Sequence, residues 1–306
     1  CVLCLLNSAK AVSPFAKRSL CVSQNLTLQQ TASNWFDSIE PGYSAYALID
    51  LANVLGDKRT LLRKLQGSGA LNVLDDNRPE AEEALPWLWP LGGSTDDTNH
   101  FELTLKWAGQ SACVTWLSSR LPAHQLCHGL ERRTQAELPD NYPILLRHFD
   151  PRVLHELVSV LNDEQAETFW ALDGVWAYVD RARQLKTISL HKADPLKRFE
   201  APLSLSQLQA DQLLAAAEVD RVMPELIREA SEQFLAIAPL ERVPFTRTWL
   251  KQADDLQLTS FADRVLLAVL ALKLGSDFLT QPKWQPLAVS LKKKQITLLQ
   301  AIKQAS

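Results

Sequence analysis

Short apolar runs separated by polar turns occupy the first two thirds of this chain. Residues 46–50, 175–179 and 185–190 have the length and apolar character of strands, and residues 144–146 predict another buried strand. Apolar positions at helical spacing follow from Val153 onward and predict a helix. Strands and helices mix here without regular alternation, so we predict an α+β lobe with a mixed sheet.

The segment from residue 101 to residue 117 predicts a hairpin. Apolar residues alternate from Phe101 to Trp107, as they do along a half-buried strand. Gly109 and Gln110 suit the turn, and residues 112–117 form the return strand. Periodicity and caps predict helices for the remaining segments of this lobe, at residues 27–39, 51–65, 122–137 and 163–170.

From Pro202 onward the pattern is helical, with no convincing strand. Ser204 and Gln207 have the spacing of a capping box, which predicts a helix start. We expect Pro224 to divide or kink the helical run that follows. A final helix over residues 282–305 carries three lysines that fit a solvated face.

These patterns divide the chain into three parts. Residues 1–23 form an atypical N-terminal extension, residues 24–198 the α+β lobe, and residues 199–306 an all-helical C-terminal lobe. The extension begins with Cys1 and an apolar run too short for a signal-peptide core. Two interpretations stay open: an artefactual or mis-assigned start, which we favour, and an acylated lipoprotein cysteine.

Composition narrows the choice of partner and compartment. The formal net charge of −3 and the isoelectric point near 6.1 carry no global signature of nucleic-acid or acidic-membrane binding. Five cysteines, an odd number, form no disulfide framework and fit a reducing cytoplasm. No apolar run approaches the roughly 20 residues that cross a bilayer. We therefore predict a cytoplasmic protein with no nucleic-acid or membrane partner.

Catalytic and metal-binding motifs are missing from the sequence. It contains no glycine-rich phosphate loop and no Gly-x-Ser-x-Gly motif. His124 and His128 stand four residues apart, but Gln125 occupies the position of the glutamate in a zinc-protease motif, and no third ligand is evident. We accordingly assign no catalytic residue, no metal site and no cofactor.

Residues 147–154 hold the most informative constellation. Asp150 is a favoured helix N-cap, and Pro151 suits the first helical position. Arg147 and Arg152 flank this cap closely enough to pair with its carboxylate, or with Asp50 across the sheet. Asp50 and Asp150 both follow predicted strands, where open α/β sheets place ligand sites. An enzyme or small-ligand-binding protein that uses a strand-end cleft around Asp50, Arg147 and Asp150 is therefore the alternative hypothesis.

An aromatic segment lies at residues 84–93. Two prolines keep it out of a helix and out of a central ladder position, so we predict an extended edge segment. Trp87 and Trp89 would then point to the same face. Core packing is the commoner fate of such rings, and a partner-binding aromatic patch is the alternative.

Taken together, these segments resemble the family of type VI secretion effector chaperones, also called adaptors of the Tap or TEC type. Residues 46–50 resemble the family's Tyr-Ala-Leu-hydrophobic-Asp strand, and residues 84–91 its Ala-Pro-aromatic-Leu segment, with Leu85 inserted. Residues 147–154 resemble its Arg-Phe-Tyr-Asp-Pro-Arg-Val-Leu signature, with His148 and Phe149 at the two aromatic positions. The resemblance covers about residues 43–190 and continues through Glu164, Gln165, Phe169, Trp170 and Trp176.

The resemblance implies a non-catalytic adaptor that binds a toxic effector in the bacterial cytoplasm and loads it onto the VgrG spike protein. The effector and VgrG are then the expected partners. The family signature residues Asp50, Arg147, Asp150, Pro151 and Arg152 are expected to support the fold or contact a partner. A periplasmic lipoprotein, such as an immunity protein, is a third and weaker hypothesis that depends on Cys1.

Overall fold

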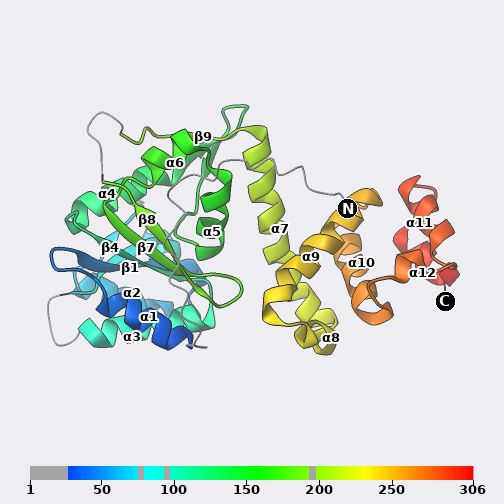
Figure 1. The fold of residues 1–306 in the computed structure, drawn as a ribbon, viewed down its shortest axis with the longest axis horizontal. Coiled ribbons are helices and arrows are strands. Elements are labelled where there is room, and N and C mark those ends of the chain that lie inside the picture. The colour runs from blue at the N-terminus through cyan, green and yellow to red at the C-terminus, as the bar shows by residue number, and fades with distance from the viewer. Residues whose placement is uncertain (1–26, 75–78, 93–96, 193–197, 306) are drawn as a thin grey trace, which may run out of the picture.

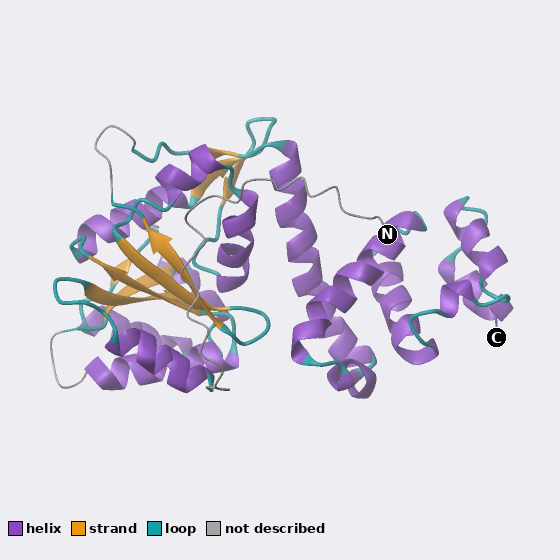
Figure 2. Cartoon of the chain, viewed as in Figure 1, coloured by secondary structure: helices purple, strands orange, loops and turns teal. Residues whose placement is uncertain are grey.

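The computed structural model describes residues 27–74, 79–92, 97–192 and 198–305. The predictions for the extension at residues 1–23, Cys1 included, lie outside the described residues. An α+β part precedes an all-helical part, as the apolar pattern predicts (Figures 1 and 2). The fold class is confirmed.

The main sheet has six strands in the order β2–β3–β1–β4–β7–β8. Their bounds are β1 (Ser44–Asp50), β2 (Leu71–Asn72), β3 (Pro86–Pro90), β4 (Val114–Ser119), β7 (Gly174–Val179) and β8 (Leu185–Leu190). The strands predicted over residues 46–50, 175–179 and 185–190 are confirmed. Every neighbouring pair in this sheet is antiparallel, so the main sheet is not mixed.

A second, smaller sheet contains the parallel pairing. Its order is β6–β5–β9, with bounds β5 (Gln135–Glu137), β6 (Pro143–Leu145) and β9 (Leu203–Ser204). β5 pairs antiparallel with β6 and parallel with β9. Since β9 lies beyond Pro202, the expectation of no strand in that region is wrong by this one short strand.

Both faces of the main sheet are buried under helices (Figure 1). Along β1, Tyr46 and Leu48 enter one hydrophobic core, and Ala47 and Ile49 enter the other, as the two-residue period of a strand requires. The first core is completed by α4 (Ala123–Arg133), α5 (Pro151–Val160) and α6 (Asp163–Phe169). The second is completed by α1 (Leu28–Asp37), α2 (Lys58–Gly67) and α3 (Asp97–Gln110). Short 3-10 turns lie at η1 (Leu51–Asn53), η2 (Pro79–Ala84) and η3 (Phe278–Thr280).

The hairpin predicted for residues 101–117 is wrong in its first half, which is helix α3. Phe101, Thr104, Leu105 and Ala108 are its buried positions, and their spacing is helical. The apparent alternation arises because Leu103 and Trp107 are also apolar and pack at the margin of the same core. The return strand is confirmed as β4, and Trp116 on it donates a 2.9 Å hydrogen bond to the Thr104 hydroxyl.

The aromatic segment forms β3, but β3 is not at the edge of the sheet. The two-residue strand β2 pairs with it at Leu88 and Trp87 and forms the edge itself. The prolines are tolerated because they occupy the first and last positions of β3.

The helical part contains α7 (Gln207–Glu229), α8 (Ser231–Ala236), α9 (Pro239–Asp255), α10 (Phe261–Leu274), α11 (Gln285–Lys292) and α12 (Leu298–Ala305). Three sequence predictions need correction here. The capping box is Ser206 with Gln209, because Ser204 is engaged in β9. Helix α7 runs from Gln207 to Glu229 with Pro224 inside it, so Pro224 does not divide the run into two helices. The final helix is two helices, separated where Lys294 adopts a positive φ of 55°.

Helix α7 joins the two parts (Figure 1). Near its start, Gln209 and Ala210 are buried, and Leu213 packs against the core of the α+β part. Further along, Val219, Val222 and Leu226 belong to the core of the helical part. One helix therefore contributes to both cores and couples them mechanically.

Candidate functional site

The signature segment crosses from the small sheet to helix α5. The buried strand predicted at residues 144–146 is partly wrong: β6 is an edge strand on which Leu145 is 52% exposed. Leu146, which follows the strand, is buried, as are His148 and Phe149. The burial that the sequence suggested therefore lies in the turn after the strand.

Asp150 caps α5 as predicted. Its Oδ1 accepts the backbone N–H of Arg152 at 2.9 Å, and Pro151 occupies the first helical position. The Arg152 guanidinium closes onto the same carboxylate through Nε, at 3.0 Å, and Nη2, at 2.7 Å. Asp150 is nearly fully buried, so this pairing neutralises a charge that would otherwise be costly.

Asp50, at the end of β1, is fully buried and pairs with the other signature arginine. Arg147 Nη2 donates to Asp50 Oδ2 at 2.6 Å. Asn53 Nδ2 lies 2.7 Å from Asp50 Oδ2 and 3.4 Å from Asp150 Oδ2, and so links the two carboxylates. Burial raises the pKa of Asp50, the Arg147 charge opposes that rise, and the Asp150 charge adds to it.

His148 stands at one of the two aromatic positions of the signature and is fully buried. Its ring meets Phe149, Phe169 and Trp176 edge-on. Nε2 lies 2.9 Å from the Leu130 carbonyl oxygen, a distance that fits an N–H donor. Burial lowers the pKa of His148 to about 4, so the ring is neutral near pH 7.

A second ion-pair network holds α7 against the α+β part. Arg181, which follows β7, bonds Asp220 of α7 through Nε at 2.8 Å and Nη2 at 2.7 Å. Its Nη1 bonds Glu156 of α5 at 2.8 Å, and Glu156 also pairs with Arg247 of α9 at 2.7 Å. Sequence reasoning missed this network, since its members lie far apart in the chain and follow no motif.

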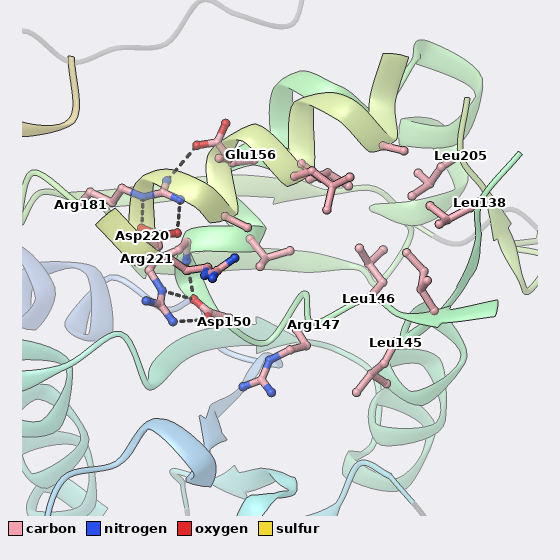
Figure 3. A pocket seen from close by; sticks show the side chains of 18 residues that line it. Leu138, Leu145, Leu146, Arg147, Asp150, Glu156, Arg181, Leu205, Asp220 and Arg221 are labelled. Carbon is pink, nitrogen blue, oxygen red and sulfur yellow. Dashed lines mark hydrogen bonds and ion pairs between the residues drawn. The ribbon is translucent and has the colours of Figure 1, made fainter. Parts of the chain in front are cut away.

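A cavity of about 430 Å³ opens between the signature segment and α7 (Figure 3). Its apolar walls include Ile144, Leu145, Leu213 and Leu214. One end is charged, and there the pairs Arg152–Asp150 and Arg181–Asp220 line the wall beside Arg147 and Arg221 (Figure 3). The cavity combines an apolar surface with a fixed set of charges.

The cavity does not match the strand-end cleft of the enzyme hypothesis. Arg147 and Asp150 line it, whereas Asp50 lies beneath Arg147 and is not part of the lining. Each carboxylate is engaged by an arginine of the same chain. The arrangement neutralises charge inside the fold.

Two further sets of predicted residues lie elsewhere. Trp87 and Trp89 share one face, as expected, but they are 6% and 0% exposed and pack in the core. They offer no exposed aromatic patch to a partner. His124 and His128 are exposed on α4, and His128 Nδ1 lies 3.1 Å from Glu131. Within the described ranges, no three His, Cys, Asp or Glu residues are grouped to hold a metal ion.

Cys113 and Cys127 are buried free thiols. Burial raises the pKa of each to about 11, so both are protonated near neutral pH. A protonated, buried thiol is a poor nucleophile, and these two residues fit packing positions.

Comparison with family models gives a match over part of the chain. A family model described as "Domain of unknown function (DUF4123)" matches residues 45–168. The match begins in β1, ends in α6, and contains Asp50, Arg147 and Asp150. No curated protein and no solved structure gives a match. Of the helices in the described ranges, none combines the length and apolarity that a membrane-crossing segment needs.

Proposed function

We propose that this protein is a non-catalytic adaptor that binds a type VI secretion effector in the cytoplasm and delivers it to the VgrG spike. Residues 45–168 match the DUF4123 model, and the same region carries the segments that resemble the adaptor family. A role of this kind requires protein-binding surfaces and no catalytic centre.

The observation that carries the proposal is that the two carboxylates of the signature are buried and paired with its arginines. Asp50 pairs with Arg147, and Asp150 pairs with Arg152. Breaking such a buried pair is costly, so these residues serve the fold before they serve a ligand. Beside them lies a largely apolar cavity, which suits contact with a protein segment better than acid–base chemistry.

The test measures binding of the purified full chain to two proteins: the product of the neighbouring toxin gene and the VgrG encoded with it. Co-purification with the toxin, together with a measurable affinity for VgrG, is the expected result. Absence of binding to both proteins would contradict the proposal. A matched preparation carrying Asp150→Ala should lose binding and thermal stability together, because Asp150 caps α5 and pairs with Arg152 inside the α+β part.

A further inference from the structure

The cavity beside the signature segment has one wall made by a helical stripe of α7. Ala210, Leu213, Leu214, Ala217 and Arg221 line it, and their spacing places them on one face of the helix. At 1.5 Å per residue the stripe is about 16 Å long, or about three helical turns. Alanines on either side of the two leucines leave room for another helix to approach closely.

The facing wall is also apolar and open. Ile144 and Leu145 of β6 line it together with Leu138. Leu145 is 52% exposed, and Leu214 across the cavity is 66% exposed. Exposed leucines on two facing walls form an apolar patch of the kind that marks a protein interaction site.

The charged end of the cavity presents cations to solvent. The Arg147 side chain is 39% exposed, whereas its partner Asp50 is fully buried. The Arg152 side chain is 32% exposed, whereas the side chain of its partner Asp150 is 6% exposed. Arg221 is exposed and stacks over the Phe261 ring, and in the part of the chain that the structure describes no carboxylate lies within ion-pair distance of it. The acidic residues that line this end, Asp150, Glu156 and Asp220, are each paired with an arginine of this chain. A complementary partner therefore carries an acidic side chain at this end.

The small sheet argues against a strand as the occupant. β6, the edge strand of the small sheet that lines the cavity, has three residues, and Pro143 lacks a backbone N–H to offer an added strand. A helix satisfies its own backbone hydrogen bonds and needs just side-chain contacts. The geometry favours helix-in-groove binding.

Resting on the proposed function, we infer that this cavity receives one amphipathic helix of the effector. The helix is about three turns long. It places apolar side chains between Leu145 and Leu214 and an acidic side chain against the exposed guanidinium groups of Arg147, Arg152 and Arg221.

The test measures the dissociation constant of the full chain for the toxin encoded next to it, in wild type and four variants. Leu214→Glu and Arg221→Glu alter the cavity. Leu208→Glu is the matched apolar control, because Leu208 lies on the same helix, is 68% exposed and does not line the cavity. Lys303→Glu on α12 is the matched charge control. Thermal melts verify that all variants fold.

We expect Leu214→Glu to weaken binding by roughly thirtyfold and Arg221→Glu by roughly tenfold, with both controls near wild type. Synthetic peptides that tile the toxin should include one that competes for binding, gains helical circular dichroism when bound, and loses affinity with Leu214→Glu. Replacing the acidic residue of that peptide by arginine should restore its binding to the Arg221→Glu variant.

The outcomes separate this inference from the proposed function. Wild-type binding to neither toxin nor VgrG would contradict the proposed function. Toxin binding that both cavity variants retain would overturn the helix inference alone. Loss of VgrG binding with retained toxin binding, a competing peptide that stays extended, or self-association of the chain abolished by Leu214→Glu would each overturn it as well.

Discussion

Arg147 and Asp50 lie 97 residues apart in the chain and form a 2.6 Å ion pair in which the carboxylate is fully buried. The pair fastens the end of β1 to the turn that leads into α5. Arg152 and Asp150 form a second ion pair with a buried carboxylate at the start of α5, and Asn53 contacts both carboxylates. These four residues and Asn53 therefore join the central strand to the capped helix.

Removing Arg147, the ion-pair partner of Asp50, should destabilise the fold. Arg147→Met leaves Asp50 buried without its cation, and we expect a loss of about 2 kcal/mol in the free energy of unfolding. This expected loss is smaller than for a fully buried pair, because the Arg147 side chain is 39% exposed and screened by water. Urea denaturation measures it, and a double-mutant cycle with Asp50→Asn isolates the pairing. Purely additive effects would contradict the coupling.

The pH dependence of Asp50 follows from its raised pKa. A carboxyl group that binds its proton more tightly when folded adds stability at low pH and loses it as the pH rises through the folded pKa. Relative to Asp50→Asn, which does not titrate here, the wild type should gain stability on acidification from neutral pH. Unfolding free energies of both proteins across that range test the sign. A wild-type advantage that shrinks in acid would mean that Arg147 outweighs burial.

His148 should have the opposite effect. Its pKa is lowered to about 4 from an ordinary value of 6.5, so the unfolded chain binds the proton more tightly below pH 6.5. Its contribution to stability is complete above pH 6.5 and is lost as the pH falls toward 4. His148→Phe keeps the aromatic contacts and removes the titration, so its stability should decline less steeply in acid. Parallel pH profiles of the two proteins would contradict the buried neutral state.

Arg181 should fasten α7 to the α+β part. Arg181→Met removes the shared cation of Glu156 and Asp220, whose side chains are 13% and 17% exposed, and we expect a loss of about 3 kcal/mol. Hydrogen exchange should accelerate in α7 around Asp220, where Arg181 is bonded. Arg228→Met on the same helix is the control, because Arg228 pairs at the surface with Glu225 and Glu229. Equal effects of the two variants would contradict a role for Arg181 in joining the lobes.

The Asp150 cap can be separated from its charge. Asp150→Ala removes both and should cost about 1–2 kcal/mol from the lost cap, and more from the unpaired Arg152. Asp150→Asn keeps an oxygen that can accept the Arg152 N–H, so its loss of stability should be smaller. Thermal melts rank the two variants. Lost binding to the proposed effector with an unchanged melting temperature would instead make this segment a contact surface.

Much of the fold was predictable because its signals are local. The strands at residues 46–50, 175–179 and 185–190 and the Asp150 cap each depend on residues within a few positions of one another. Where two local patterns competed, the prediction failed. In α3, apolar residues on adjacent helical faces produced the alternation that is typical of a strand. Ser204 and Gln207 have capping-box spacing, but Ser206 is the residue that caps α7.

The sequence by itself determined that Asp150 and Pro151, which lie between Arg147 and Arg152, start a helix. It also determined that a part containing strands precedes an all-helical part. The tertiary structure alone decided that Arg147 takes Asp50 while Arg152 takes Asp150, that Glu156 and Asp220 share Arg181, and that Trp87 and Trp89 are buried. It also formed the cavity between β6 and α7. The physical reason is distance along the chain: a cap or a turn is formed by neighbouring residues, whereas an ion pair or a cavity wall depends on how separate elements pack.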